Sequence, residues 1–201
     1  MTEFILATGN QGKIVELKKL LADLPVRVVS VKEKNLSLDV EENGSSFLEN
    51  AVIKAGAIHA HTGGFVMADD SGLEVDALGG EPGIYSARFM GEDADYPTKI
   101  AELWRRLEGI PMEQRTARFV CAVALYCPDG SVYTTVKNWE GLLYDRMVGE
   151  HGFGYDPVFY LPEIQKTSAE ISPEEKNRIS HRGQAVSAVL AYLKESWYSV
   201  V

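Results

Sequence analysis

Residues 4–21 read FILATGNQGKIVELKKLL: an apolar run, a short polar loop, and an apolar segment with a new period. Beyond the loop, apolar residues recur at the spacing of one helix face until Pro25: Ile14, Leu17, Leu20, Leu21 and Leu24. The stretch therefore predicts a strand that passes through a tight loop into a helix.

Strand and helix signals interleave along the rest of the chain. Strands are predicted at 26–31, 65–68, 115–126 and 132–140, the last two as a hairpin across Pro128-Asp129-Gly130. Helices are predicted from Ser46, in a Ser-x-x-Glu capping box, to Gly63, and at about 97–107. A last helix is predicted to begin at Ser172-Pro173, to break near Ser180-His181 and then to resume. Its predicted inner face consists of Val186, Val189, Leu190, Leu193 and Trp197. The predicted class is α/β with a hairpin insertion.

Composition narrows the classes of function. The chain has 201 residues, of which 45% are hydrophobic and 24% charged, and its formal net charge is −9. A nucleic acid would be repelled by that charge, so an anionic ligand must be met by a few placed cations and a metal ion. Cys121 and Cys127 indicate reduced core thiols. With no signal-peptide pattern and no run of about 18 apolar residues, a cytoplasmic protein without a membrane span is expected.

The loop Thr8-Gly9-Asn10-Gln11-Gly12-Lys13 is the first candidate site. Amides at a helix N-terminus and a lysine ammonium together favour a phosphate group. The loop is not a Walker A motif, which needs Gly and Ser or Thr where this chain has Ala7 and Ile14. Taken alone, the loop fits an ordinary strand-to-helix turn better than a phosphate site.

Asp69 and Asp70 follow the predicted strand 65–68 and form the second candidate site. Neighbouring strand residues point to opposite faces, so at most one of them faces a given cleft unless the strand ends there. Carboxylate oxygens suit Mg²⁺, and Glu41 or Glu42 could add a second ligand. The alternative is a solvated acidic turn.

Two later stretches could bind an organic group. In Gly152-Phe153-Gly154-Tyr155-Asp156, an aromatic ring between glycines could stack on a nucleobase, with Asp156 on the base edge. The commoner alternative is a turn whose aromatic rings pack inward. In Glu174–Arg182, three basic side chains lie close in sequence: Lys176, His181 and Arg182. They also fit a solvated basic face.

Six motifs in this order resemble the inosine triphosphate pyrophosphatase family, and its bacterial dITP/XTP pyrophosphatases in particular. They are ATGNQGK from Ala7, EENGSSFLENA from Glu41, ADDSGLEVDALGG from Ala68, PGIYSAR from Pro82, GFGYDPVF from Gly152 and EEKNRISHRGQA from Glu174. The resemblance implies one domain over 1–201 with two lobes: an elongated α/β fold, a long mixed sheet flanked by helices, and an active-site cleft between the lobes. It also implies a homodimer and no nucleic-acid or membrane partner.

The resemblance further implies cleavage of dITP, ITP, XTP or dXTP into the monophosphate and pyrophosphate, with Mg²⁺. Asp70 would be the general base and a metal ligand, with Glu41 the favoured second ligand over Glu42. Lys54 and Asp69 are lesser candidates. Substrate would be bound by Thr8, Gly9, Asn10, Gln11, Gly12, Lys13, Ser71, Phe153, Gly154, Tyr155, Asp156, Lys176, His181 and Arg182.

Three alternatives stay open at this point. A Maf-like pyrophosphatase would act on pyrimidine or modified nucleotides. A nucleotide sensor would bind without turnover, although paired acids beside a phosphate loop argue against it. A nucleic-acid-binding protein is disfavoured by the net charge.

Overall fold

A computed structural model describes residues 2–36 and 40–200, with side chains up to residue 196. In chain order its elements are β1 (Glu3–Leu6), α1 (Gln11–Leu20), β2 (Arg27–Ser30), α2 (Phe47–Thr62), β3 (Phe65–Val75), α3 (Tyr96–Arg106), β4 (Thr116–Tyr126), β5 (Val132–Leu143), β6 (Phe159–Leu161), β7 (Lys166–Thr167), α4 (Pro173–Ile179) and α5 (His181–Val200). No helix in the described ranges is both long and apolar enough to cross a membrane.

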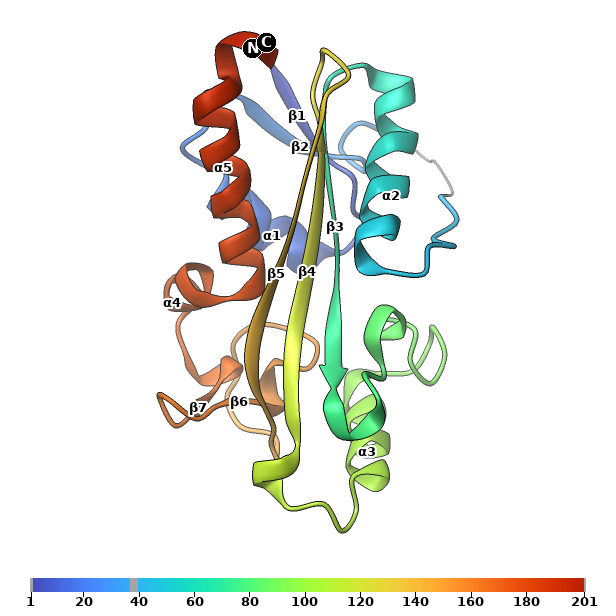
Figure 1. Cartoon of the computed structure of the whole chain (residues 1–201), viewed down its shortest axis with the longest axis vertical. Helices are drawn as coiled ribbons and strands as arrows, with labels where there is room; N and C mark the ends of the chain where they lie inside the picture. The colour runs from blue at the N-terminus through green and yellow to red at the C-terminus, as the bar shows by residue number, and fades with distance from the viewer. Residues whose placement is uncertain (1, 37–39, 201) are drawn as a thin grey trace. The chain divides into compact units, whose positions relative to one another are not determined.

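The strands form one mixed sheet in the order β2-β1-β3-β4-β5-β6-β7 (Figure 1). β1 runs parallel to β2 and β3, whereas β6 is antiparallel to β5 and β7. The predicted α/β class with a long mixed sheet flanked by helices is therefore confirmed. The chain divides into two compact units, each described below by itself.

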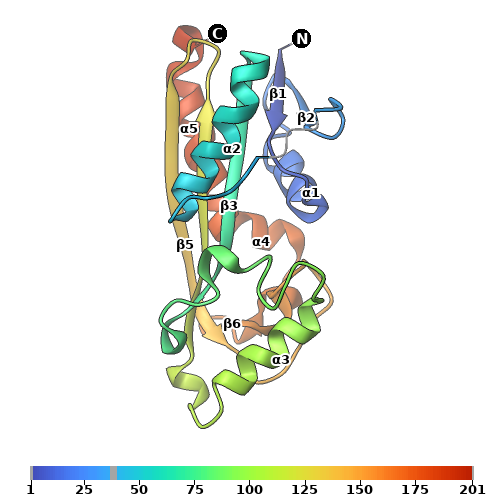
Figure 2. The same ribbon diagram turned by 90° about the vertical axis from the view of Figure 1, so that its right-hand side faces the viewer.

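Unit 1 comprises Met1–Asp70, Cys121–Lys137 and Arg182–Val201. Helices α2 and α5 cover opposite faces of its part of the sheet (Figure 2). On the α5 side, buried residues from α1 and α5 pack with residues of β1, β3 and β4, among them Leu17, Val186, Phe4, Phe65 and Val123. The predicted inner face of α5 is confirmed as far as Leu193; the side chain of Trp197 lies outside the described ones.

The ends of α2 follow the predicted signals with one change. Ser46 Oγ accepts the backbone N–H of Glu49 at 3.1 Å, as an N-cap does. The Glu49 carboxylate accepts from the N–H and hydroxyl of Ser45 instead of the N–H of Ser46, so the reciprocal half of the capping box shifts by one residue. Gly63 ends the helix at a left-handed φ of 64°.

Unit 2 comprises Ser71–Val120 and Asn138–His181. Its core joins α3 to the ends of β3, β4 and β5 and to β6, through buried residues that include Leu73, Leu103, Phe119, Leu143 and Phe159. Helix α3 begins at an Asp95 N-cap, and its bounds match the predicted helix within one residue. The predicted break before the last helix is also confirmed, because α4 ends at Ile179 and α5 begins at His181.

The main difference from the predicted elements lies in β3. The sequence predicted a strand that ends at Ala68, but β3 continues to Val75, so Asp69 and Asp70 lie inside it. Polar residues next to a glycine are typical of a turn. In this strand, cations and amides from neighbouring helices pair with the two carboxylates, which removes the cost of burying them.

Gly149 offers a test of the packing in unit 2. At its φ of 89°, an added Cβ would lie 2.3 Å from the carbonyl carbon and oxygen of Ala169. Gly79 also has a positive φ, 66°, but an added Cβ there meets nothing within 4 Å. Gly79→Ala should cost about 1–2 kcal/mol of unfolding free energy from backbone strain alone. Gly149→Ala should cost roughly 1–3 kcal/mol more from overpacking.

Urea unfolding of both variants beside the unaltered protein measures the difference. Equal losses in the two variants would mean that the close approach of Gly149 to Ala169 is wrong.

Candidate active site

The loop before α1 presents the N-terminal end of that helix. Asn10 is the N-cap, and its side-chain oxygen accepts the N–H of Lys13 at 3.1 Å. Its own N–H donates to Thr8 Oγ1 at 3.2 Å. Gly9 and Gln11 are exposed, and a Cβ at Gly9 would meet nothing within 4 Å. The exposed loop and the positive end of the helix dipole can therefore receive an anion.

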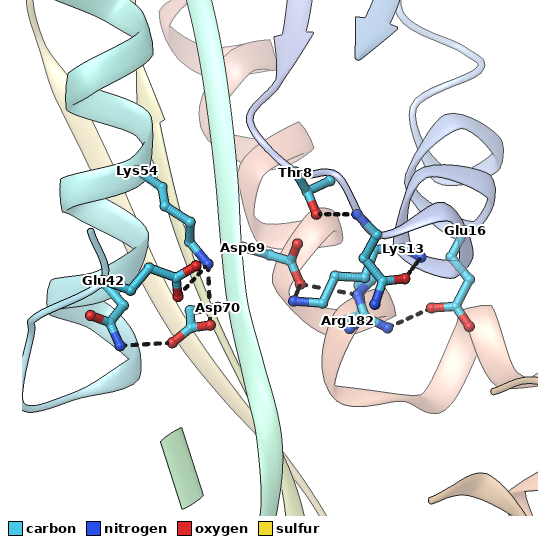
Figure 3. A network of polar contacts seen from close by, with 10 residues as sticks. Thr8, Lys13, Glu16, Glu42, Lys54, Asp69, Asp70 and Arg182 are labelled. Carbon is cyan, nitrogen blue, oxygen red and sulfur yellow. Dashed lines mark hydrogen bonds and ion pairs between the residues drawn. The ribbon is translucent and has the colours of Figure 1, made fainter. Parts of the chain in front are cut away.

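Asp69 joins α1 and α5 on one face of β3 (Figure 3). Its carboxylate is fully buried, and Oδ2 lies 3.0 Å from Lys13 Nζ and 3.3 Å from Arg182 Nε. The guanidinium of Arg182 also pairs with Glu16 of α1, at 2.5 Å. The buried ion pairs therefore run from Lys13 through Asp69 and Arg182 to Glu16.

The charge of Asp69 is fixed by its neighbours. Burial alone raises the pKa of its carboxyl, but attraction to Lys13, Arg182 and Lys54 outweighs this and holds the pKa well below its usual range. A depressed pKa in the folded state adds stability above about pH 4, the range of an unfolded aspartate, and this is lost as pH falls through the folded pKa. Asp69 is thus ionised at neutral pH and pairs with two cations.

Asp70 faces the opposite side of β3, toward α2 (Figure 3). Its Oδ1 lies 3.2 Å from Lys54 Nζ, and its Oδ2 accepts from Asn50 Nδ2 at 3.3 Å. Lys54 Nζ also lies 3.1 Å from Glu42 Oε2. Burial lowers the pKa of Lys54. The carboxylates of Asp70, Asp69 and Glu42 together raise it by more than burial lowers it, so the pKa of Lys54 lies above its ordinary value. The alternation of strand side chains that separates the two acids is confirmed.

The acids on the α2 side bear on the choice of a metal ligand. Glu42 reaches the Asp70–Lys54 pair, whereas Glu41, the residue favoured from the resemblance, is exposed. Within the described ranges, no three acidic, histidine or cysteine side chains cluster as metal ligands. Mg²⁺ commonly takes only one or two carboxylates, with water and substrate phosphates completing its shell. Asp70 and one acid of the 41–42 pair fit that donor set.

A cavity of about 260 Å³ in unit 1 connects these groups. The phosphate loop contributes Thr8 and Gly9 to its wall, and the acidic side contributes Glu42 and Lys54. Its remaining lining is mostly aliphatic: Ala7, Val31, Leu36, Val40 and Ile58. The loop residues Thr8 and Gly9 therefore line the same cavity as Glu42 and Lys54.

In unit 2, the carboxylate of Asp156 is buried and engaged by its own protein. Oδ2 accepts from Phe153 N at 2.8 Å and from Lys176 Nζ at 2.7 Å, and Oδ1 accepts from Ser168 Oγ at 2.8 Å. A Cβ on Gly152, whose φ is 77°, would lie 2.0 Å from Oδ2, so only glycine fits there. The role of Asp156 at a base edge stays a prediction; in this structure its carboxylate holds Lys176 and the Phe153 backbone.

The aromatic residues of unit 2 divide into buried and accessible ones. Tyr155 is buried, donates its hydroxyl to Ser86 O at 2.9 Å and packs edge-on to Tyr96, and its burial raises its pKa. The inward-packing alternative is therefore correct for Tyr155. Phe153 is partly exposed, and Lys176 Nζ lies 5.2 Å from its ring centroid. Gly154, next to it, has a φ of 69°.

The three basic side chains singled out in the 174–182 stretch are all buried, so they do not form a solvated face, and Lys176 pairs with Asp156. His181 is buried, with its ring stacked on Phe119 at a centroid distance of 4.9 Å. Arg182 is buried and forms ion pairs with Asp69 and Glu16, so its guanidinium is not a solvent-exposed donor. Ser71, expected to touch substrate, is partly exposed in β3.

The sequence reading missed two residues. Glu16 follows Lys13 by three positions, so both project from one side of α1, which was a usable signal. Asn50 is a fully buried polar residue beside Ala51 on the inner face of α2, and a polar residue in an apolar stripe was the signal there.

Comparison with known proteins agrees with this description. Residues 4–192 match the model of the Ham1 family. The dITP/XTP pyrophosphatase of Geobacillus kaustophilus is 50% identical over 201 residues, 100% of this chain and 97% of that protein. The solved Staphylococcus aureus Ham1 protein has a TM-score of 0.87 at 42% identity, over 97% of this chain and 100% of that one.

A second solved structure is similar along nearly the whole chain. The nucleoside-triphosphatase, or dITP/XTP pyrophosphatase, of Mycobacterium abscessus has a TM-score of 0.76 at 41% identity and covers 94% of this chain and 99% of that one. The resemblance drawn from the six sequence motifs is thereby confirmed, and the chain belongs to the Ham1 family.

Proposed function

We propose that this protein hydrolyses non-canonical purine nucleoside triphosphates, dITP, ITP, XTP and dXTP, to the monophosphate and pyrophosphate in the cytoplasm. The observation that carries the proposal is the pair of acids on opposite faces of β3, beside the N-terminus of α1. Relatives that are 50% and 48% identical bear the name dITP/XTP pyrophosphatase. That name also supports purine substrates over the pyrimidine substrates of a Maf-like enzyme. A homodimer remains part of the proposal.

The two faces of β3 differ in formal charge, which suggests their roles. On the Asp69 face, Lys13 and Arg182 balance Asp69 and Glu16, and the α1 N-terminus adds partial positive charge. On the Asp70 face, one ammonium meets two carboxylates, which leaves a formal excess of one negative charge. Phosphates therefore suit the loop side, and a cation suits the acidic side.

Phosphate binding, proton transfer and metal binding can then each be assigned to residues of the protein. The exposed loop at the N-terminus of α1 and the Lys13 ammonium bind phosphate oxygens, while Asp69 keeps Lys13 and Arg182 in position. Asp70 accepts the proton of the attacking water. Mg²⁺, held by Asp70 and Glu41 or Glu42, would neutralise phosphate charge when bound.

Base recognition is assigned to Phe153 and Lys176. The partly exposed Phe153 ring can stack on a purine, and Lys176 Nζ beside it can only donate hydrogen bonds. The carbonyl at C6 of hypoxanthine or xanthine accepts such a bond, whereas the amino group of adenine cannot. Asp156 takes a supporting role by holding Lys176, and His181 supports the pocket through its stacking on Phe119.

The first test is a product panel with the unaltered protein. With Mg²⁺ present, dITP and XTP should release pyrophosphate much faster than dATP, by about two decades if two groups are left unpaired at about 1–3 kcal/mol each. Coupled pyrophosphate and orthophosphate assays, run with and without chelator, measure this. Orthophosphate as the first product, or binding of dITP without turnover, would contradict the proposal.

A second prediction separates the acids. Asp70→Asn should reduce turnover by roughly 10²–10⁴-fold, because the amide cannot take the proton from water. Glu41→Gln and Glu42→Gln, compared side by side, should show which acid sets the Mg²⁺ requirement; the contact with Lys54 favours Glu42. Mg²⁺ titrations of turnover give the answer, with the exposed Asp93→Asn as the matched control. Near-normal turnover in Asp70→Asn would refute the base assignment.

A third prediction concerns Lys13. Lys13→Ala should weaken dITP turnover by about tenfold or more, since a charge-assisted hydrogen bond contributes about 1.5–3 kcal/mol. It should also lower stability, because the buried Asp69 loses one cation. Lys18→Ala, which removes the exposed ion pair to Glu33 one turn along, is the control and should change neither. Steady-state kinetics and urea unfolding of both variants test this. An unchanged kcat/KM in Lys13→Ala would mean that the loop is an ordinary strand-to-helix turn without a role in phosphate binding.

A further inference from the structure

We infer that Asn50 is a positioning residue that locks the carboxylate of Asp70 to the segment Glu42–Gly44. The inference rests on the proposed role of Asp70 as the base. Asn50 is uncharged, and although it lies within the EENGSSFLENA motif, no chemical role was predicted for it from the sequence.

The contacts of Asn50 are directional. Its side chain is fully buried in the first turn of α2. Nδ2 donates to Asp70 Oδ2 at 3.3 Å, and Oδ1 accepts the backbone N–H of Gly44 at 2.9 Å. A carboxamide has both a donor and an acceptor, and this site uses each of them.

Asn50 and Lys54 form a matched pair on α2. They are four residues apart, so their side chains project from the same helix face. Lys54 holds Oδ1 of Asp70 and reaches Glu42, whereas Asn50 holds Oδ2 of Asp70 and reaches Gly44. Two parallel bridges therefore connect Asp70 to the acidic segment, and together they fix both oxygens of the carboxylate.

Gly44 shows that this approach is close. A Cβ on Gly44 would lie 2.7 Å from Asn50 Oδ1 and 2.8 Å from Glu49 Cβ. Any larger residue would push the segment away from α2. The absence of a side chain at Gly44 and the amide of Asn50 thus serve the same contact.

The chemical consequence is a carboxylate with fixed orientation. Each oxygen of Asp70 accepts one bond from α2 and retains acceptor capacity for a water molecule or a cation. A base held in one orientation avoids reorganisation during the reaction, and a displacement of about 1 Å costs about 10²-fold in rate. Asn50 thereby acts through Asp70, without a contact to substrate of its own.

Two substitutions separate the two contacts. Asn50→Asp keeps an acceptor for the Gly44 N–H but replaces the donor to Asp70 with a negative charge. Asn50→Leu has a similar size and removes both bonds. The control is Asn138→Asp, the same change at an exposed position of β5.

Kinetics with dITP and amide hydrogen exchange at Gly44 are then measured on the full chain, with thermal melting as a check on folding. Asn50→Asp should lose about 10²-fold in kcat with KM changed by less than about threefold, while Gly44 exchange stays slow. Asn50→Leu should lose kcat and also Gly44 protection. Asn138→Asp should match the unaltered protein in every measurement.

If the Asn50 variants unfold, Gly44→Ala provides a second test. It leaves Asn50 unchanged and displaces only the Glu42–Gly44 segment from α2. It should speed exchange across residues 42–44 and lower kcat. Unchanged kcat in any folded Asn50 variant, or slow Gly44 exchange in Asn50→Leu, would overturn the inference. Failure of the unaltered protein to release pyrophosphate from dITP would instead count against the proposed function, and the exchange result would still decide the contact.

Discussion

Two adjacent carboxylates inside a buried strand impose the main constraint on unit 1. Asp69 and Asp70 lie in β3, and strand geometry sends them to opposite faces. A buried carboxylate is tolerated only with charge or hydrogen-bond partners, so each face must supply its own. Helices α1 and α5 supply Lys13 and Arg182 to Asp69, and α2 supplies Lys54 and Asn50 to Asp70.

This pairing links packing to function. The helices that cover the sheet also carry the charged groups, so the packing of each helix must place its cation beside the strand as well as bury its apolar face. Lys13 is in the first turn of α1, and its pairing with Asp69 places the helix N-terminus and the Thr8–Gly9 loop beside the strand. The geometry proposed to bind phosphate therefore accompanies the neutralisation of a buried acid, and does not require a Walker-type sequence.

Most of the element pattern was predictable because its causes are local. Periodicity gave α1 and the inner face of α5, and the capping residues Ser46 and Asp95 lie at the starts of their helices. The length of β3 was not predictable from local signals. Its acidic pair is typical of a turn until partners from distant segments are known, and Arg182 lies 113 residues from Asp69 along the chain.

The candidate site shows the same limit. The motifs contain Lys13, Asp70 and Lys176, which lie in polar clusters, but residue type alone did not reveal the partners of each acid. Asp156 was interpreted as a base-edge group because a carboxylate between glycines is an attractive acceptor. Its partners Ser168 and Lys176 lie 12 and 20 residues away, so the local sequence did not show that this carboxylate is buried and holds a lysine.

Asp69, Asp156 and Asn50 have in common that they are buried and hold a neighbouring functional group in place. Asp69 holds Lys13, Asp156 holds Lys176, and Asn50 holds Asp70. Without a partner, a lysine ammonium or a carboxylate would sample several orientations. A buried partner fixes the orientation when the chain folds, so the entropy of ordering the side chain is lost on folding and not during a reaction. Gly44 and Gly152 make these contacts possible. Each lets the backbone approach a buried polar side chain, Asn50 and Asp156 respectively, at a distance that a Cβ would forbid. Gly44 and Gly152 therefore each mark a place where the backbone closely approaches a buried polar side chain.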